Sequence, residues 1–194
     1  MNDISKHYDM LISEGQDPVH DPKPLRDYMD KWDGQIFIDK MKLDKTKSVL
    51  EIGVGTGRIA VKTAPDCRRF TGIDISEKTI GKAKENIKNA VLICGDFLKY
   101  DFKEKFDVIY SSLTFLHIKE KQKAFNTVHR LLNENGRFVL SVDKNQDKIL
   151  DAGFSKITVY PDNHDEIKKC AFSSGLKLAE QCETEFAHIF VFEK

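Results

Sequence analysis

Three glycines at alternate positions follow a short apolar run and begin a stretch with the chemistry of a cofactor site. The apolar run is residues 48–52, and Glu51 stands near its end. The three glycines are Gly53, Gly55 and Gly57. Because glycine adopts backbone conformations that a Cβ atom would block, a ligand can lie directly against the main chain of such a loop. Residues 58–64 have helical character, so the unpaired N–H groups at the start of a helix would face that ligand.

The spacing of these glycines separates two classes of cofactor. The dinucleotide fingerprint G-x-G-x-x-G would require its third glycine at position 58, which is Arg58. A dinucleotide also presents a pyrophosphate, which the acidic Glu51 at the strand end would repel, whereas a cationic ligand would be favoured there. The pattern therefore disfavours a nucleotide-dependent oxidoreductase, although the strand-loop-helix order keeps it as an alternative.

Acidic residues also end or follow the next two predicted strands. Residues 69–74 form the second apolar strand pattern and end in Asp74, whose carboxylate can accept hydrogen bonds from both hydroxyls of a ribose. Ser76 is a suitable N-cap for a helix over residues 77–87. Residues 90–94 predict a third strand, and Asp96 follows it directly after a glycine.

Together these motifs resemble those of the class I (Rossmann-like) S-adenosylmethionine (SAM) dependent methyltransferases, in the small-molecule branch similar to methyltransferase types 11 and 12. Residues 51–57, acid-x-Gly-x-Gly-x-Gly, resemble motif I of that family. Residues 106–117 are similar to its F-D-x-V-x-S-x-x-x-L-x-H segment, and residues 130–137 resemble its R-x-L-K-P-G-G turn with one glycine in place of two. The resemblance runs from about Val49 to the C-terminus and covers the first 45 residues only loosely.

The resemblance implies an α/β fold, a Rossmann-like doubly wound sheet of seven mostly parallel strands with a C-terminal antiparallel hairpin and helices on both faces. The sequence agrees, with strand patterns over residues 106–110 and 138–142 and helical patterns over 119–132 and from 164 to about 174. Residues 176–180 and 187–192 predict the final hairpin. Residues 143–163 are expected to form an irregular insertion.

SAM is the cofactor that the resemblance implies. In the family, an acid after the third strand often bonds the adenine amino group and an apolar neighbour lies along the base, and Asp96 and Phe97 match that pattern. Arg58 is placed either to reach the SAM carboxylate or on the helix surface. The full set of expected cofactor contacts is Glu51, Gly53, Val54, Gly55, Gly57, Arg58, Asp74, Ile75, Asp96, Phe97 and Ser111.

The sequence contains fewer motifs for binding the methyl acceptor than for binding the cofactor. His117 lies just beyond strand four, where ligands collect in open α/β sheets, and it is either a general base or acceptor contact or a packed loop histidine. Tyr8, Trp32 and Tyr160 are expected to line the acceptor pocket, although Trp32 also fits an ordinary buried helix face. No Asp/Asn-Pro-Pro-Tyr follows strand four, which disfavours exocyclic base and glutamine amide nitrogens, and no Pro-Cys stands there for cytosine C5 chemistry. No His, Asp or Glu cluster has metal-ligand spacing, so no metal is expected.

Length and composition favour one structural domain. Residues 1–45 are expected to form an N-terminal helical lid that docks only weakly, and residues 46–194 the SAM-binding domain. The 31 basic and 31 acidic residues give a formal net charge of zero, which argues against a protein that binds nucleic acid mainly by charge. There is no apolar stretch of membrane-spanning length, no signal-peptide pattern and no disulfide framework among the four cysteines, so a cytoplasmic monomer or homodimer is predicted.

The leading hypothesis is therefore an enzyme that transfers the sulfonium methyl of SAM to an oxygen, nitrogen or sulfur atom of a small molecule by in-line displacement. The sulfonium already activates the methyl group, so the protein mainly has to align a nucleophile and exclude water. A SAM-binding sensor or partner subunit without turnover is the second hypothesis, and the oxidoreductase is the third.

Overall fold

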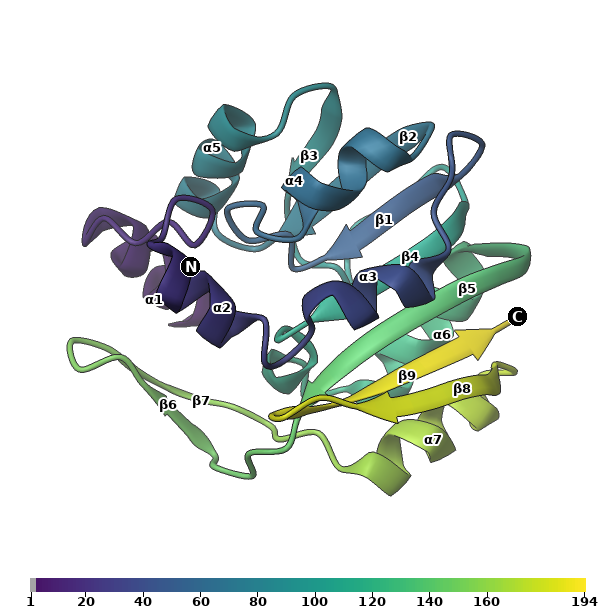
Figure 1. Ribbon diagram of the computed structural model, residues 1–194. Coiled ribbons are helices and arrows are strands. Elements are labelled where there is room, and N and C mark those ends of the chain that lie inside the picture. The colour runs from purple at the N-terminus through teal and green to yellow at the C-terminus, as the bar shows by residue number, and fades with distance from the viewer. Residues whose placement is uncertain (1–2) are drawn as a thin grey trace.

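The central strand of the molecule is β1, Ser48–Ile52, in which every residue is buried. A strand that is covered on both faces has a continuous apolar sequence, which is why it could be predicted. The computed structural model describes residues 3–194 and places β1 within a seven-stranded sheet of order β3-β2-β1-β4-β5-β9-β8 (Figure 1). The other strands of this sheet are β2 Arg69–Asp74, β3 Ala90–Cys94, β4 Phe106–Ser112, β5 Leu132–Asp143, β8 Lys177–Glu183 and β9 Ala187–Glu193. Strands β1 to β5 are parallel, and β9 is antiparallel to its neighbours β5 and β8.

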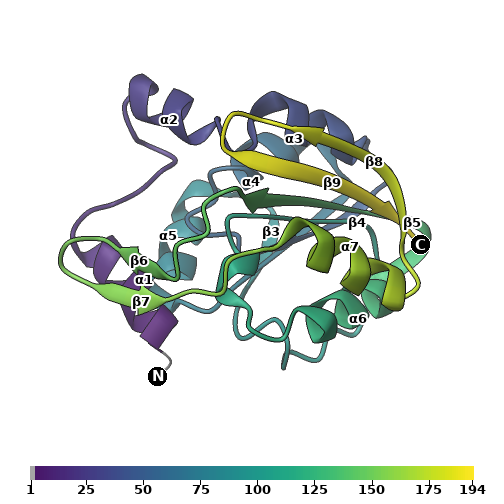
Figure 2. The ribbon, with the colours of Figure 1, turned by 90° about the horizontal axis from the view of Figure 1, so that it is seen from below.

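Helices cover both faces of this sheet (Figure 2). One face carries α3 Gly34–Met41, α4 Ala60–Thr63 and α5 Glu77–Asn86, and the other carries α6 Lys121–Leu131 and α7 His164–Ser173. Phe37 and Ile80 belong to the apolar cluster on the first face, and Phe125 and Ile167 belong to the cluster on the second. The expected doubly wound α/β fold with a C-terminal antiparallel pair is confirmed.

Two segments differ from the pattern that the sequence predicts. β5 begins as early as Leu132, because this residue already pairs with Phe106 of β4. An irregularity follows, in which Asn135 takes a φ of 62°. Regular pairing resumes between Val108 and Arg137. Residues 143–163 are not irregular throughout, because β6 Ile149–Asp151 and β7 Lys156–Thr158 pair as an antiparallel hairpin. The turn of this hairpin is closed by a hydrogen bond from the Ala152 N–H to the Ser155 carbonyl. In Figure 1 the hairpin projects from the body of the domain below α1.

Residues 23–41 form two helices separated by a turn. α2, Lys23–Met29, has Pro24 in its first turn, and α3 starts again at Gly34 after the turn over residues 30–33. Asp33 caps α3 by accepting a hydrogen bond from the Gly34 N–H at 2.6 Å. Phe37 and Met41 of α3 are fully buried, so this helix is part of the core and the expected separate cap does not extend to residue 45.

The first helix, α1 Asp3–Ser13, docks through polar rather than apolar side chains. Ser5, His7 and Asp9 are its buried residues. The Asp9 carboxylate accepts hydrogen bonds from the Ser76 hydroxyl at 2.6 Å and from the Lys78 N–H at 3.2 Å, both at the start of α5. The scarcity of large apolar residues in α1 predicted weak docking, and these buried hydrogen bonds supply a specific attachment instead.

We expect Gly57→Ala to lower the free energy of unfolding by about 1–3 kcal/mol, because of backbone strain and overpacking. Gly57 has a φ of +104°, and an added Cβ would lie 2.6 Å from the Ile87 Cδ1. Gly81→Ala is the matched control, because its Cβ would meet nothing within 4 Å on the exposed side of α5. This control should raise stability by about 0.5–1 kcal/mol. Urea unfolding of both variants measures the difference, and a Gly57→Ala protein as stable as wild type would contradict this packing.

Candidate functional site

A cavity of about 380 Å³ lies where the carboxyl ends of β1, β2 and β4 meet. Strands β2 and β3 extend from β1 on one side, and β4 and β5 extend on the other, so this is the point where the strand order changes direction. Ligands of open α/β sheets bind at such a point. The volume suits one small ligand.

The glycine loop forms one wall of this cavity with its backbone. The N–H groups of Gly53 and Val54 donate to the Ile73 carbonyl at 2.8 and 3.1 Å, which ties the loop to β2. Gly53 takes a φ of +75°, and a Cβ there would lie 1.9 Å from the Thr114 hydroxyl oxygen. At Gly55, with a φ of +56°, a Cβ would meet nothing within 4 Å. The Gly55 backbone is therefore open to a ligand, as the glycine pattern predicts.

Asp74 stands beside this loop at the end of β2. Its carboxylate accepts hydrogen bonds from the Gly55 N–H at 3.1 Å and from the Ser76 N–H at 3.0 Å, and it lines the cavity. Burial raises the pKa of the Asp74 carboxyl, and the two N–H donors oppose that rise. The remaining acceptor capacity of a carboxylate held in this way suits a ligand with hydroxyl donors, such as a ribose.

Glu51 lies near the end of β1, just before the glycine loop. Its carboxyl group is buried and accepts a hydrogen bond from the Tyr110 hydroxyl at 2.8 Å, and Tyr110 in turn contacts the Thr63 hydroxyl at 2.7 Å. Burial raises the pKa of the Glu51 carboxyl well above its usual range. The Glu51 carboxyl group is thus held by the Tyr110 side chain of β4, and Glu51 also lines the cavity.

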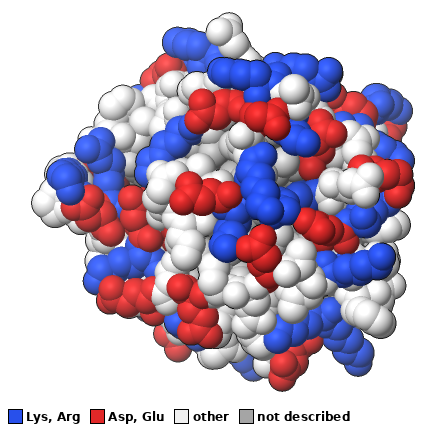
Figure 3. Space-filling model, turned by 45° about the vertical axis from the view of Figure 1, so that its right-hand side comes forward, with Lys and Arg blue, Asp and Glu red and all other residues white. Residues whose placement is uncertain are grey.

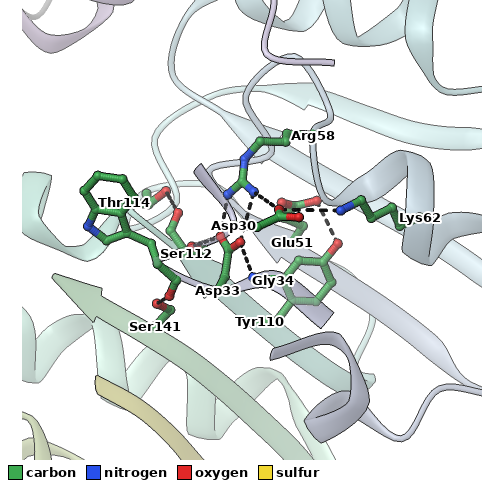
Figure 4. A network of polar contacts seen from close by, with 11 residues as sticks. Asp30, Asp33, Gly34, Glu51, Arg58, Lys62, Tyr110, Ser112, Thr114 and Ser141 are labelled. Carbon is green, nitrogen blue, oxygen red and sulfur yellow. Dashed lines mark hydrogen bonds and ion pairs between the residues drawn. The ribbon is translucent and has the colours of Figure 1, made fainter. Parts of the chain in front are cut away.

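Arg58 also lines the cavity, and its guanidinium forms a buried ion pair (Figure 4). Arg58 Nη1 donates to Asp33 Oδ1 at 2.9 Å, and Nη2 pairs with Asp33 Oδ2. Ser112, at the end of β4, donates its hydroxyl to the same carboxylate at 2.7 Å. Of the two placements that the sequence allows for Arg58, the structure excludes a freely solvated surface position.

Asp96 and Phe97 follow β3 and line the opposite side of the cavity. Asp96 Oδ1 accepts a hydrogen bond from the Leu98 N–H at 2.9 Å, and Oδ2 pairs with Lys99 at the same distance. The Phe97 ring is almost fully buried and packs against Phe102. An aromatic face and a carboxylate are thus adjacent, as recognition of a base with an amino group requires.

His117 and Tyr8 meet on the side of the cavity that α1 covers. The Tyr8 hydroxyl and His117 Nε2 are 2.7 Å apart, and their rings contact edge to face. Burial lowers the pKa of His117 to about 4. Burial and the nearby Asp74 charge raise the pKa of the Tyr8 hydroxyl. Both groups are therefore uncharged near neutral pH.

The backbone around His117 is fixed from the segment that follows the β6–β7 hairpin. The Tyr160 N–H donates to the Leu116 carbonyl at 2.7 Å. The buried Lys121 ammonium donates to the Phe115 carbonyl at 2.5 Å and to the Tyr160 carbonyl at 2.9 Å, and it pairs with buried Asp162 at 2.6 Å. These contacts hold the short 3-10 turn η2, Phe115–His117, in place.

Most of the predicted site residues line one cavity. Those residues are Tyr8, Glu51, Gly53, Val54, Gly55, Arg58, Asp74, Ile75, Asp96, Phe97 and His117. Four others lie outside its lining, namely Gly57, Ser111, Trp32 and Tyr160. The cavity is also lined by residues that the sequence did not single out, among them Pro18, Met29, Ser112, Leu113 and Thr114.

The four residues outside the lining have other contacts. Gly57 faces Ile87, the residue that follows α5, and the Ser111 hydroxyl donates to the Ile52 carbonyl within the sheet. Because neighbouring residues of a strand point to opposite faces, Ser112 faces the cavity in place of Ser111. The Trp32 ring packs against Phe186 with ring centroids 4.7 Å apart, and it lies in the turn between α2 and α3 rather than on a buried helix face. The Tyr160 backbone N–H donates to the Leu116 carbonyl, and its carbonyl accepts from Lys121.

Across residues 3–194, no three His, Cys, Asp or Glu side chains come close enough together to hold a metal ion. No helix within the same range is long and apolar enough to span a membrane.

A family model described as a methyltransferase domain matches residues 43–181 of this chain. An uncharacterised methyltransferase of Bacillus licheniformis is 32% identical over 168 residues, which cover 83% of this chain and 69% of that protein. An uncharacterised methyltransferase of Bacillus cytotoxicus is 37% identical over 97 residues, which cover 48% of this chain and 46% of that protein. The chain thus spans about half the length of the Bacillus cytotoxicus relative.

Among solved structures, the fold is similar to the N-methyltransferase NodS of Bradyrhizobium japonicum in complex with S-adenosyl-L-homocysteine. The TM-score is 0.68, with 18% sequence identity, and the alignment covers 100% of this chain and 99% of that one. At this level of identity the likeness is one of fold.

The low pKa of His117 predicts that its ring stays neutral from about pH 5.5 to pH 8, unlike an unperturbed histidine. Nitrogen chemical shifts of the imidazole, assigned by comparison with His117→Gln, measure this directly. In the urea-unfolded protein the same ring should titrate near 6.5, its ordinary value. A titration midpoint above about 6 in the folded protein would contradict the burial of this ring.

The lowered pKa of His117 also affects the free energy of unfolding. The unfolded chain binds a proton at His117 below about pH 6.5, whereas the folded chain binds it only near pH 4, so acid favours unfolding. This contribution to the free energy of unfolding is complete above the ordinary pKa and is lost as the pH falls toward 4. His117→Gln should therefore reduce the loss of stability between these pH values by roughly 3 kcal/mol.

Proposed function

Because the chain belongs to the SAM-dependent methyltransferase family, as its motifs predicted, we propose that it methylates a small molecule in the cavity at the ends of β1, β2 and β4. SAM is the cofactor of this family. The observation that carries the proposal is the Asp74 carboxylate, which lines the cavity next to the open backbone of Gly55. A hydroxyl-bearing ligand without a phosphate fits this arrangement of carboxylate and glycine backbone.

The residues of the cavity fit SAM better than a dinucleotide. When bound, SAM supplies a methyl group activated by a sulfonium. Asp74 would accept the ribose hydroxyl hydrogen bonds, Asp96 and Phe97 would receive the adenine, and Arg58 would face the amino-acid carboxylate. Glu51 and Asp74 place two carboxyl groups in the lining. Burial raises the pKa of both groups, and a cationic ligand would favour their charged forms, whereas a pyrophosphate would oppose them.

The acceptor would lie on the side of the cavity formed by α1 and residues 113–118. Apolar side chains such as Leu113 and Ile118 form much of this wall. Its two ring groups, Tyr8 and His117, are both uncharged near neutral pH. Lys119 and Glu120, which follow Ile118, also line the cavity, so an acceptor would meet charged as well as apolar side chains.

His117 is the residue of this wall that can accept a proton. A neutral imidazole has one nitrogen lone pair, and His117 Nε2 already lies at hydrogen-bond distance from one hydroxyl, that of Tyr8. An acceptor hydroxyl that replaced Tyr8 at this nitrogen could pass its proton to His117 as the methyl group is transferred. Because burial lowers the pKa of this ring to about 4, we expect a contribution toward the lower end of the roughly 10²–10⁴-fold that is typical of general-base catalysis.

The distribution of charge supports a small-molecule acceptor over nucleic acid. In Figure 3, basic and acidic side chains are interspersed over the face shown, without an extended basic patch. The formal net charge is zero. A nucleic-acid interface draws most of its affinity from clustered Lys and Arg.

Isothermal titration with SAM and with S-adenosylhomocysteine tests the cofactor assignment. Both should bind wild type, and Asp74→Ala should weaken both by roughly 1.5–3 kcal/mol, because hydrogen bonds to a charged group are lost. Asp101→Ala is the matched control, since Asp101 pairs with Lys103 on the exposed surface. If neither ligand bound wild type, the proposal would fail. If Asp74→Ala lowered the melting temperature and left affinity unchanged, Asp74 would be structural.

Turnover separates an enzyme from a SAM-binding module. Radiolabelled SAM incubated with a fractionated small-molecule extract should yield labelled product with wild type and far less with His117→Gln. Binding of SAM without transfer to any fraction would favour a sensor or partner subunit. Energy transfer from Trp32, the single tryptophan, to bound NADH would favour an oxidoreductase.

The N-terminal segment is expected to close over the ligand. Tyr8 and Pro18 line the cavity, and the intervening chain is held mainly by polar contacts such as Asp9 to Ser76. Hydrogen exchange of residues 3–22 should be fast in the free protein and clearly slower with SAM bound, because closure excludes water. Exchange in α7, on the opposite side of the sheet, is the internal control. Equal and strong protection in both states would show a permanently docked segment.

A further inference from the structure

The Asp33 carboxylate gathers four hydrogen-bond donors in a buried position (Figure 4). Its side chain is only 2% exposed. Oδ1 accepts from Arg58 Nη1 at 2.9 Å and from the Gly34 N–H at 2.6 Å. Oδ2 accepts from the Ser112 hydroxyl at 2.7 Å and from Arg58 Nη2. Both carboxylate oxygens are thus engaged, and the guanidinium is held at two points.

The donors come from three separate parts of the chain. Asp33 lies between α2 and α3, outside residues 43–181 that match the family model. Arg58 follows the glycine loop, and Ser112 ends β4. Arg58 and Ser112 line the cavity, whereas Asp33 does not. Asp33 can therefore influence a ligand only through the residues that it holds.

Stability alone is a poor explanation for such a pair. Burying a carboxylate and a guanidinium removes both from water, and their mutual attraction often does no more than offset that cost. What a two-point contact provides is a fixed orientation of the planar guanidinium. Within residues 3–194, the guanidinium contacts only Asp33 and, at 3.4 Å, Asp30. Since a guanidinium has five N–H donors, others remain for a ligand.

We propose that Asp33 is a positioning residue that holds Arg58 in the orientation needed to receive the carboxylate at the amino-acid end of SAM. This inference rests on the proposed function, because it takes the cavity to be the SAM site. It also gives the segment between α2 and α3 a part in cofactor recognition. The Asp33 carboxylate holds the guanidinium at two points while Arg58 still lines the cavity.

The test compares ligands with and without the amino-acid end. SAM and S-adenosylhomocysteine carry it, and 5′-methylthioadenosine has the same nucleoside and sulfur without it. In Asp33→Asn, the dissociation constants of SAM and S-adenosylhomocysteine should rise about 10- to 100-fold, as when a charged hydrogen bond is lost. The dissociation constant of 5′-methylthioadenosine should change by less than about twofold, since it makes no use of Arg58.

Two further variants complete the design. Asp27→Asn is the matched control on α2, where Asp27 pairs with Lys23 on the surface, and it should bind all three ligands like wild type. Ser112→Ala removes one donor to Asp33 without changing charge, so SAM affinity should fall about two- to tenfold with 5′-methylthioadenosine unaffected. This variant decides the question if Asp33→Asn does not fold, and unchanged SAM affinity in it would then overturn the inference.

The outcomes separate this inference from the proposed function. If wild type bound none of the three ligands, the proposed function itself would fail. If wild type bound them and Asp33→Asn bound SAM equally well, the positioning role would be overturned. Equal losses for SAM and 5′-methylthioadenosine would also overturn it, because a purely structural role lowers both. Only a selective loss for the ligands that carry the carboxylate supports it.

Discussion

The contact between the glycine loop and the end of β2 sets the geometry of the whole site. Two consecutive N–H groups, of Gly53 and Val54, donate to the Ile73 carbonyl, and the next glycine donates to Asp74. The loop also approaches the segment after β4 so closely that a Cβ on Gly53 would collide with Thr114. The loop, the end of β2 and the segment after β4 therefore have one mutual arrangement, and the cavity between them follows from it.

The N-terminal segment is joined to this centre mainly by buried polar contacts. Asp9 binds the start of α5, Tyr8 meets His117, and Asp33 binds Arg58. Apolar packing tolerates small shifts, whereas a buried hydrogen bond that is lost leaves an unpaired group at a high cost. Such contacts fix the register of a segment that has little apolar surface of its own.

The cavity divides into two electrostatic environments. Around the glycine loop, Glu51 and Asp74 provide acidic groups, which suit a cationic cofactor with hydroxyl donors. Around His117, burial keeps the ring neutral, and the lining combines the apolar Leu113 and Ile118 with the charged Lys119 and Glu120. The first environment is anchored by strands β1 and β2, and the second depends on η2, on α1 and on the buried Lys121–Asp162 pair. A single cavity thus contains a side with two buried carboxyl groups and a side with a neutral imidazole.

The sequence by itself determined the strands, the glycine loop and the convergence of Asp74 and Asp96. These follow from local patterns, because apolar runs define buried strands and the carboxyl ends of parallel strands meet at one edge of the sheet. Which of Ser111 and Ser112 faces the cavity was decided by the pleat of β4, and the motif spacing does not reveal it. The hairpin β6–β7 and the break between α2 and α3 depended on turn and capping contacts that periodicity does not report. Only the tertiary structure decided that Arg58 is held by Asp33 and that Tyr8 meets His117, since each pair joins residues far apart in the chain and forms only when separate elements pack.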